Sequence, residues 1–281
     1  MNTLSANSSP ALIPQAVTVP RAMVALRTLV FALLVVTLVT SITTLTPWSS
    51  AHAQAPAADN DPNRPFNAQL QAGLSALERK HYSTALRSWG PLANSGEPRA
   101  QNNMGIMYER GWGVTQSYTE AMSWYRRAAD QALPEAQYNL GTLYHNGYGT
   151  EVNNSQAVFW FKKAADQNLP DAMYMMGLHL YEGKGIRQDK MAAKFQFLKA
   201  ARRGNVNSQF MAGYTFMDEA AGKPDLVAAH AWATVSQLNG YEGAVEILNF
   251  TQFKLKRTEI DLALNMARRC RTSGYRECPG S

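Results

Sequence analysis

The residues of this chain that could take part in chemistry are few. Of the five histidines, His52 falls in an N-terminal segment of unusual composition, and the others are His81, His145, His179 and His230. No two of these four are three or four residues apart, so the sequence contains no helical pair suited to binding zinc. We therefore predict packing or surface roles for them and no metal site.

Three closely spaced glycine pairs could suggest phosphate-binding loops. They are Gly111-Trp112-Gly113, Gly147-Tyr148-Gly149 and Gly183-Lys184-Gly185. None follows a strand of a βαβ unit, which a phosphate-binding loop of this kind requires, so we interpret them as turns between helices. The sequence also lacks a G-x-S-x-G elbow, an S-x-x-K serine site and a lone catalytic cysteine. We therefore predict a protein that is not an enzyme and needs no cofactor.

Composition favours a folded protein with a mild positive charge. The chain has 281 residues, of which 46% are hydrophobic and 17% charged, which is ample for a sizeable core. Its formal net charge is +6, and it falls to +4 once Arg21 and Arg27 in the N-terminal segment are set aside. An excess of this size gives no reason to expect nucleic acid as a partner.

The N-terminus has the parts of a secretory signal peptide. Arg21 and Arg27 precede the apolar run Leu29–Val39, and the segment ends in Ala51-His52-Ala53. A basic flank, an apolar stretch and an A-x-A site together predict a cleaved leader at residues 1–53. The mature chain would then be periplasmic, or secreted.

Two alternatives remain for this segment. Residues Leu29–Leu45 are just long enough to span a bilayer, so an uncleaved anchor is the competing interpretation. Translation could also begin at Met23 instead of Met1, which would leave a shorter basic opening. Residues 54–65 are rich in Pro, Ala and Asp and predict a flexible linker.

The rest of the chain repeats with a period of 36 residues. One column of the repeat holds Gly105, Gly141, Gly177 and Gly213. A second column holds Ala100, Ala136 and Ala172, and a third holds Trp124, Trp160 and Trp232. A fixed period of this length predicts stacked supersecondary units.

Each repeat is expected to form two helices. In the clearest repeat the first helix spans about Pro134–Asn146, because proline suits a first helical turn and apolar residues recur at helical spacing. The glycine at 141 lets a neighbouring helix approach closely. The second helix spans about Asn153–Gln167, with a predicted packing stripe that includes Phe159, Trp160 and Phe161.

These elements predict an all-α protein, an α-solenoid of helix-turn-helix repeats. The repeats occupy residues 66–240, the first of them shorter in its inter-helix loop. Two further helices, at about Tyr241–Phe250 and Thr258–Cys270, would form a C-terminal helical cap over residues 241–281. An end unit of a solenoid needs a polar outer face, and the last helix is Arg-rich on its polar side.

The pattern A-x-x-x-L/M-G-x-x-Y-x-x-G-x-G-V followed by A-x-x-W-Y/F-x-x-A-A resembles the Sel1-like repeat family, relatives of the tetratricopeptide repeats. The resemblance covers roughly residues 66–240. It departs in the third full repeat, where Leu180 replaces tyrosine and Gln196 replaces tryptophan. It implies an α-solenoid that binds a protein or peptide partner, and exported bacterial members suggest a role in the cell envelope.

By analogy with the tetratricopeptide repeats, partner-binding positions lie on the first helix of each repeat, three residues before the glycine and one, four or five after it. The candidate groove residues are Asn102, Glu109, Tyr138, Thr142, His145, Tyr174, Tyr181 and Tyr214. Tyrosine supplies contact area and a hydrogen-bonding tip, which suits recognition. The alternatives are that several rings pack between repeats, and that the groove binds peptidoglycan or exopolysaccharide.

Cys270 and Cys278 are the only two cysteines. An even pair at the end of an exported chain predicts a disulfide that closes the turn between them, with a redox site as the alternative.

Basic residues also gather near the C-terminus, between Lys254 and Arg276. A solvated cap face is the favoured interpretation of these charges over contact with an acidic polymer or lipid head groups.

Overall fold

A computed structural model describes residues 64–280 of the chain. The predicted signal peptide at 1–53 and most of the predicted linker lie outside these residues. The chain divides between Ala57 and Ala58, and everything below concerns the second part. Its first helix, α1, begins at Arg64, two residues before the predicted start of the folded region.

The described residues form helices and no strand, so the all-α prediction is confirmed. The helices are α1 (Arg64–Glu78), α2 (Tyr82–Asn94), α3 (Pro98–Arg110), α4 (Tyr118–Asp130), α5 (Pro134–Asn146), α6 (Asn154–Asp166), α7 (Pro170–Glu182), α8 (Lys190–Ala201), α9 (Val206–Thr215), α10 (Leu226–Leu238), α11 (Ala244–Lys254) and α12 (Arg257–Thr272), with a short 3-10 helix η2 (Glu219–Ala221). The repeating pairs have the predicted helix-turn-helix form.

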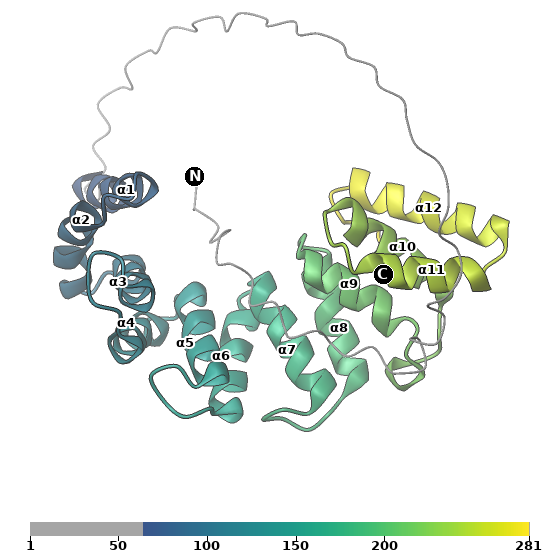
Figure 1. The fold of residues 1–281 in the computed structure, drawn as a ribbon, viewed down its shortest axis with the longest axis horizontal. Coiled ribbons are helices and arrows are strands. Elements are labelled where there is room, and N and C mark those ends of the chain that lie inside the picture. Colours follow the sequence, from purple (N-terminus) through teal and green to yellow (C-terminus); the bar gives the residue numbers. More distant parts are fainter. Residues whose placement is uncertain (1–63, 281) are drawn as a thin grey trace, which may run out of the picture. The chain divides into compact units, whose positions relative to one another are not determined.

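Helices pack mainly against their neighbours in the chain, as a solenoid requires. From α1 to α10 each helix contacts the next, and α10 additionally contacts both α11 and α12. In Figure 1, α1, α3 and α5 lie on the inner side of a curved row of helices, and α2, α4 and α6 lie on its outer side. We call the first helices of the pairs the inner helices and the second the outer helices.

Proline and glycine set the ends of the inner helices. Pro98, Pro134 and Pro170 each stand in the first turn, where the missing N–H is not needed. The first glycine of each loop pair caps the helix in the left-handed region, as at Gly147 with φ 71°. The prediction that the glycine pairs are inter-helix turns is confirmed.

The glycine column allows the two helices of a repeat to touch. A Cβ placed on Gly141 would lie 2.8 Å from the ring of Phe161, and one on Gly105 or Gly177 would lie 2.5 Å from Tyr125 or Phe197. All three rings are buried with no exposed surface. Each glycine therefore forms the socket for the aromatic residue of its own outer helix.

The second glycine of each loop pair joins one repeat to the previous one. A Cβ on Gly149 would lie 2.8 Å from the backbone carbon of Tyr118, and one on Gly185 would lie 2.4 Å from that of Asn154. The neighbouring ring of Tyr148 stacks on Tyr118 with centroids 4.7 Å apart. The loop thus packs directly on the start of the preceding outer helix.

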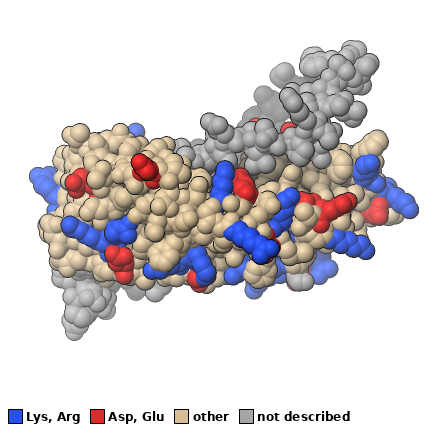
Figure 2. Space-filling model, turned by 90° about the horizontal axis from the view of Figure 1, so that it is seen from below, with Lys and Arg blue, Asp and Glu red and all other residues tan. Residues whose placement is uncertain are grey.

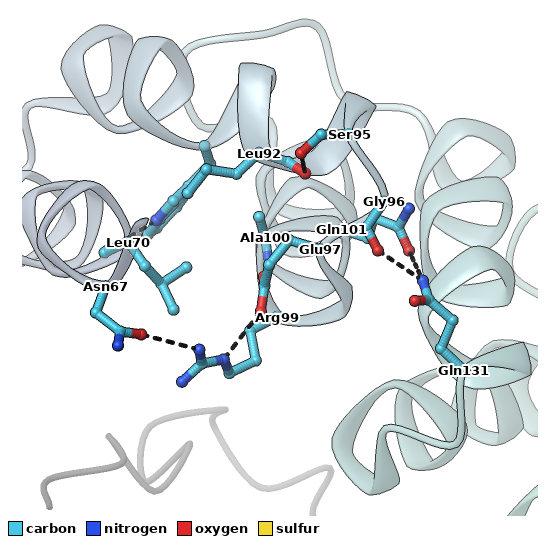
Figure 3. Close-up of polar contacts among 11 residues, drawn as sticks. Asn67, Leu70, Leu92, Ser95, Gly96, Glu97, Arg99, Ala100, Gln101 and Gln131 are labelled. Carbon is cyan, nitrogen blue, oxygen red and sulfur yellow. Dashed lines mark hydrogen bonds and ion pairs between the residues drawn. The ribbon is translucent and has the colours of Figure 1, made fainter. Parts of the chain in front are cut away.

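A buried amide also links neighbouring repeats, as Figure 3 shows for the first one. The side chain of Gln131 donates to the Oε1 atom of Gln101 at 2.8 Å and to the carbonyl of Gly96 at 2.9 Å. The Gln101 amide itself donates to the carbonyl of Ala93 at 3.1 Å. We call this arrangement the amide clamp.

The amide clamp recurs with the repeat. Gln137 donates to the carbonyl of Ala129 and accepts from Gln167, and Gln209 donates to Ala201 and accepts from Asn239. In the intervening repeat the equivalent residue is Met173, which is buried in the core. Three of four equivalent positions therefore use a buried glutamine to donate a further hydrogen bond to a carbonyl at the end of the previous outer helix, which also accepts a backbone N–H of the following turn.

The C-terminal segment folds back on the last repeat. Cys270 and Cys278 form a disulfide with Cα atoms 4.4 Å apart, and both residues are buried. The indole of Trp232 donates to the carbonyl of Pro279 at 3.1 Å, and Asn239 donates to the hydroxyl of Tyr275 at 2.9 Å. The predicted disulfide is therefore part of the core that α10 forms with α11 and α12.

Charged side chains of both signs are mixed on the surface. On the face shown in Figure 2, Lys and Arg side chains alternate with Asp and Glu among uncharged surface. This distribution agrees with the small net charge of the sequence.

Candidate functional site

The predicted groove positions lie on α3, α5, α7 and α9, and we call the surface they form the inner face. Almost all of its side chains are intermediate in exposure, so the inner face is neither a dry core nor a fully solvated surface. A face of this kind can exchange water for a partner without prior unfolding.

A row of aromatic rings runs along the inner face. Tyr138, Tyr174 and Phe210 occupy the same repeat position on α5, α7 and α9, and Phe210 stacks on Tyr241 with centroids 4.7 Å apart. The ring of Tyr138 lies 5.7 Å from Phe161, and that of Tyr174 lies 6.0 Å from Phe197. The rings of Tyr138 and Tyr174 pack on the outer-helix aromatics, as the packing interpretation expected, while all three residues of the row stay partly exposed.

Burial affects the phenol groups of this row. It raises the pKa of Tyr138 to about 12, and it also raises the pKa of Tyr174. Both hydroxyls are therefore neutral hydrogen-bonding groups at physiological pH and not nucleophiles or bases.

A polar cluster joins Tyr181 of the inner face to Asp218 and Lys190. The Tyr181 hydroxyl donates to Oδ2 of Asp218 at 2.5 Å, and Nζ of Lys190 lies 3.0 Å from the same oxygen. Together the Tyr181 and Lys190 contacts lower the pKa of Asp218, against the effect of its partial burial. Tyr214 meets Tyr181 edge-on at 6.1 Å. This cluster binds α7, α8 and the loop before α10 together.

The remaining predicted site residues are engaged with their neighbours. Asn102 is only 8% exposed and accepts from Asn139 at 2.9 Å, so it joins α3 to α5 instead of facing outward as its position predicted. Glu109 accepts from the Tyr125 hydroxyl at 2.6 Å. Thr142 donates to the backbone carbonyl of Tyr138 at 3.0 Å. A binding role for these residues stays a prediction.

Two histidines meet on the inner side, which the sequence spacing did not indicate. The rings of His145 on α5 and His179 on α7 lie edge to face, with centroids 5.1 Å apart. Nδ1 of His179 is 2.7 Å from the carbonyl of Lys184. Two other ring nitrogens, Nε2 of His179 and Nδ1 of His145, are buried and have no hydrogen-bond partner among the described residues. Burial lowers the pKa of both histidines, and the neighbouring ring lowers that of His145 further.

One predicted packing residue is not buried. Phe159 was expected in the stripe of the second helix, but its side chain is 47% exposed, while Trp160 and Phe161 are buried. Helix α6 buries only one of its faces. Phe161 lies on that face, against Gly141, and Phe159 lies on the opposite face.

The described residues contain no group of three or more His, Cys, Asp and Glu placed to hold a metal ion. Among the helices from α1 to α12, none combines the length and hydropathy needed to cross a membrane.

The geometry defines a helical repeat protein of the α-solenoid class. The model of the Sel1 repeat family matches three of its units, at residues 98–133, 134–169 and 170–205. Residues 98–205 of the chain are therefore three Sel1 repeats. The helix pairs α1–α2 and α9–α10 extend the same arrangement beyond the matched units.

Two solved structures are similar to this chain. A Sel1 repeat protein from Oxalobacter formigenes is 28% identical, with a TM-score of 0.61 over 69% of this chain and 81% of that one. A protective antigen of uropathogenic Escherichia coli strains with an SLR fold is 29% identical, with a TM-score of 0.64 over 72% of this chain and 45% of that one. No curated protein sequence matches the chain significantly. Proteins with this scaffold fold generally take part in protein interactions without catalysis.

Proposed function

We propose that this protein is an exported scaffold, periplasmic or secreted, that binds a protein or peptide partner in the cell envelope through the inner face. The observation that carries the proposal is the aromatic row of Tyr138, Tyr174 and Phe210, which presents partly exposed rings at one repeat spacing. Aromatic residues are enriched where proteins recognise one another, because they bury much area at low entropic cost.

Export is supported by two features of the chain. The N-terminal basic and apolar segment has the composition of a signal peptide. The disulfide between Cys270 and Cys278 suits an oxidising compartment, since thiols are kept reduced in the cytosol. Fractionation of cells that express the whole chain tests the localisation, and recovery only in the cytosol would contradict it.

Binding at the inner face is tested by variants that place charge there without removing the rings. Positions 106, 142, 178 and 214 hold Ile, Thr, Leu and Tyr, so this column tolerates side chains of different size. Thr142→Glu with Leu178→Glu should prevent capture of a partner from envelope extract by tagged residues 54–281. Ser123→Glu, on the exposed side of α4, is the matched control and should leave capture unchanged.

A polysaccharide partner is the alternative function. Tyrosine and asparagine also suit sugars, but proteins with this scaffold fold generally take part in protein interactions. We therefore favour a peptide. Sedimentation with purified cell wall distinguishes the two, because a scaffold for protein should stay in the supernatant.

A further inference from the structure

Two phenylalanines stand exposed at the same position of adjacent outer helices. Phe159 on α6 is 47% exposed and Phe195 on α8 is 60% exposed, 36 residues further along the chain. The other aromatic residues of these helices, Trp160, Phe161 and Phe197, are buried. The exposed pair is therefore not needed for the packing of the solenoid.

Each exposed ring has a lysine one helical turn further on. Nζ of Lys163 lies 4.6 Å from the ring centroid of Phe159, and Nζ of Lys199 lies 5.5 Å from that of Phe195. Met191, which is 56% exposed, stands one turn before Phe195. Residues four apart share one helix face, so α8 presents an apolar stretch ending in a cation. We call Phe159, Lys163, Met191, Phe195 and Lys199 the outer patch.

The helices that carry the outer patch are basic. Together α6 and α8 contain five lysines and a single acidic residue, Asp166. Nζ of Lys162 forms an ion pair with Oδ2 of Asp166 at 2.6 Å, and Lys190 forms an ion pair with Asp218. Within the described residues Lys163 and Lys199 make contacts to rings and no ion pair, so both ammonium groups are available to an external anion.

We propose that the outer patch is a peripheral binding surface for anionic lipid. Phenylalanine and methionine side chains can enter the boundary between head groups and acyl chains, while lysine ammonium groups meet the lipid phosphates. Each basic residue near an anionic bilayer adds electrostatic attraction to its surface. The excess of lysine on α6 and α8 complements the negative charge of such a bilayer.

This surface is separate from the proposed peptide site. The outer patch lies on the outer helices α6 and α8, and the aromatic row lies on the inner helices. A scaffold could therefore hold a partner on one side while the other side rests on a membrane. Loss of lipid binding and loss of partner capture are expected from different variants.

The test is cosedimentation of residues 54–281 with vesicles. All four hydrophobic cores of the described residues lie between Leu70 and Cys278, so this part carries its own core. Vesicles of phosphatidylglycerol and phosphatidylcholine should bind the protein at low salt and release it at high salt. Vesicles of phosphatidylcholine alone should bind it much more weakly.

The matched variant is Phe159→Ser with Phe195→Ser. The equivalent residue of the preceding repeat is Ser123, so the column already accepts serine. We expect at least a roughly tenfold loss of affinity for anionic vesicles, because two apolar side chains no longer enter the bilayer. Lys163→Gln with Lys199→Gln should weaken binding and reduce its dependence on salt. Circular dichroism and thermal unfolding should match the wild type for both variants, because the replaced side chains are exposed.

Three outcomes would overturn the proposal: no binding of the wild type to anionic vesicles, equal binding to both kinds of vesicle, or equal binding by the serine variant. Each of them would show that the outer patch is not a binding surface for anionic lipid. None would affect the proposed peptide site, since its variants lie on the inner helices.

Discussion

At the scale of single residues, the glycine column decides how closely the two helices of a repeat pack. Gly141 faces the ring of Phe161, and that ring fills the space that a side chain at position 141 would take. The same pairing occurs between Gly105 and Tyr125 and between Gly177 and Phe197. The sequence predicted that the glycine lets a neighbouring helix approach closely, but it did not predict which side chain would fill the space.

Gly141→Ala should destabilise the protein through this contact. The added methyl would lie 2.8 Å from the Phe161 ring, and overpacking of this kind costs about 1–3 kcal/mol. Alanine gains about 1 kcal/mol of helix propensity, which offsets part of this cost, so we expect a net loss of up to about 2 kcal/mol in urea unfolding. In a Phe161→Leu background the loss should shrink, since the smaller side chain leaves room. An equal loss in both backgrounds would show that the clash lies elsewhere.

The histidine pair is a residue-scale feature that the sequence did not reveal. His145 and His179 are 34 residues apart, close to but not at the repeat period, so they do not share a column. Their contact depends on how far α5 and α7 are turned toward each other. A spacing rule for one helix cannot detect a pair that forms between two.

The histidine pair should make the protein less stable in mild acid. Both histidines have a pKa lowered in the folded state, mainly by burial, so the folded protein binds protons less readily than the unfolded chain. Stability should be unaffected by these groups above about pH 6.5 and should fall as the pH drops below that value. Thermal unfolding at a series of pH values measures the effect.

The control for this pH dependence is His145→Gln with His179→Leu. Leucine already occupies the position equivalent to 179 in the preceding repeat, as Leu143. His230 also has a pKa lowered by burial, so the variant should keep part of the acid sensitivity and lose the rest. An unchanged pH profile in the variant would contradict the assignment.

At the scale of helices, the sequence predicted some elements closely and others only in outline. The bounds of α5 agree with the prediction, because Pro134 and Gly147 mark both ends chemically. The cap helix α11 begins at Ala244, later than the predicted Tyr241, and α12 continues to Thr272. These helices lie outside the 36-residue repeat, so no neighbouring unit helped to place their ends. Phe159 was misplaced because an aromatic residue in an aromatic run was assumed to pack.

The amide clamp is the element-scale contact most open to test. Gln137 is 2% exposed and satisfies the carbonyl of Ala129 while it accepts from Gln167. Gln137→Ala should cost about 2–4 kcal/mol, because it removes both hydrogen bonds of a buried amide and opens a cavity. Gln137→Met restores the volume, as Met173 does in the next repeat, and should cost less. Denaturant unfolding of both variants tests this, and a larger loss for methionine would refute the clamp.

At the scale of the whole described solenoid, stability comes from contacts between neighbours. From α1 to α10 contacts run from each helix to the next, and the hydrophobic residues form four successive cores. An array of this kind can open at an end while the rest stays folded. The sequence predicted the array from its period, but not how α11 and α12 close it, because both pack against α10 instead of forming another repeat.

Removing the disulfide should therefore loosen the C-terminal end first. Cys270→Ser with Cys278→Ser releases a short loop whose closure stabilises the folded state by about 2–3 kcal/mol. The hydrogen bond from Trp232 to Pro279 depends on the same loop, so α10 and α12 should lose protection together. Hydrogen exchange followed by mass spectrometry should show faster exchange in α10–α12 and little change in α3–α6. A uniform change along the chain would mean instead that the solenoid unfolds as one cooperative unit, with the disulfide stabilising every repeat equally.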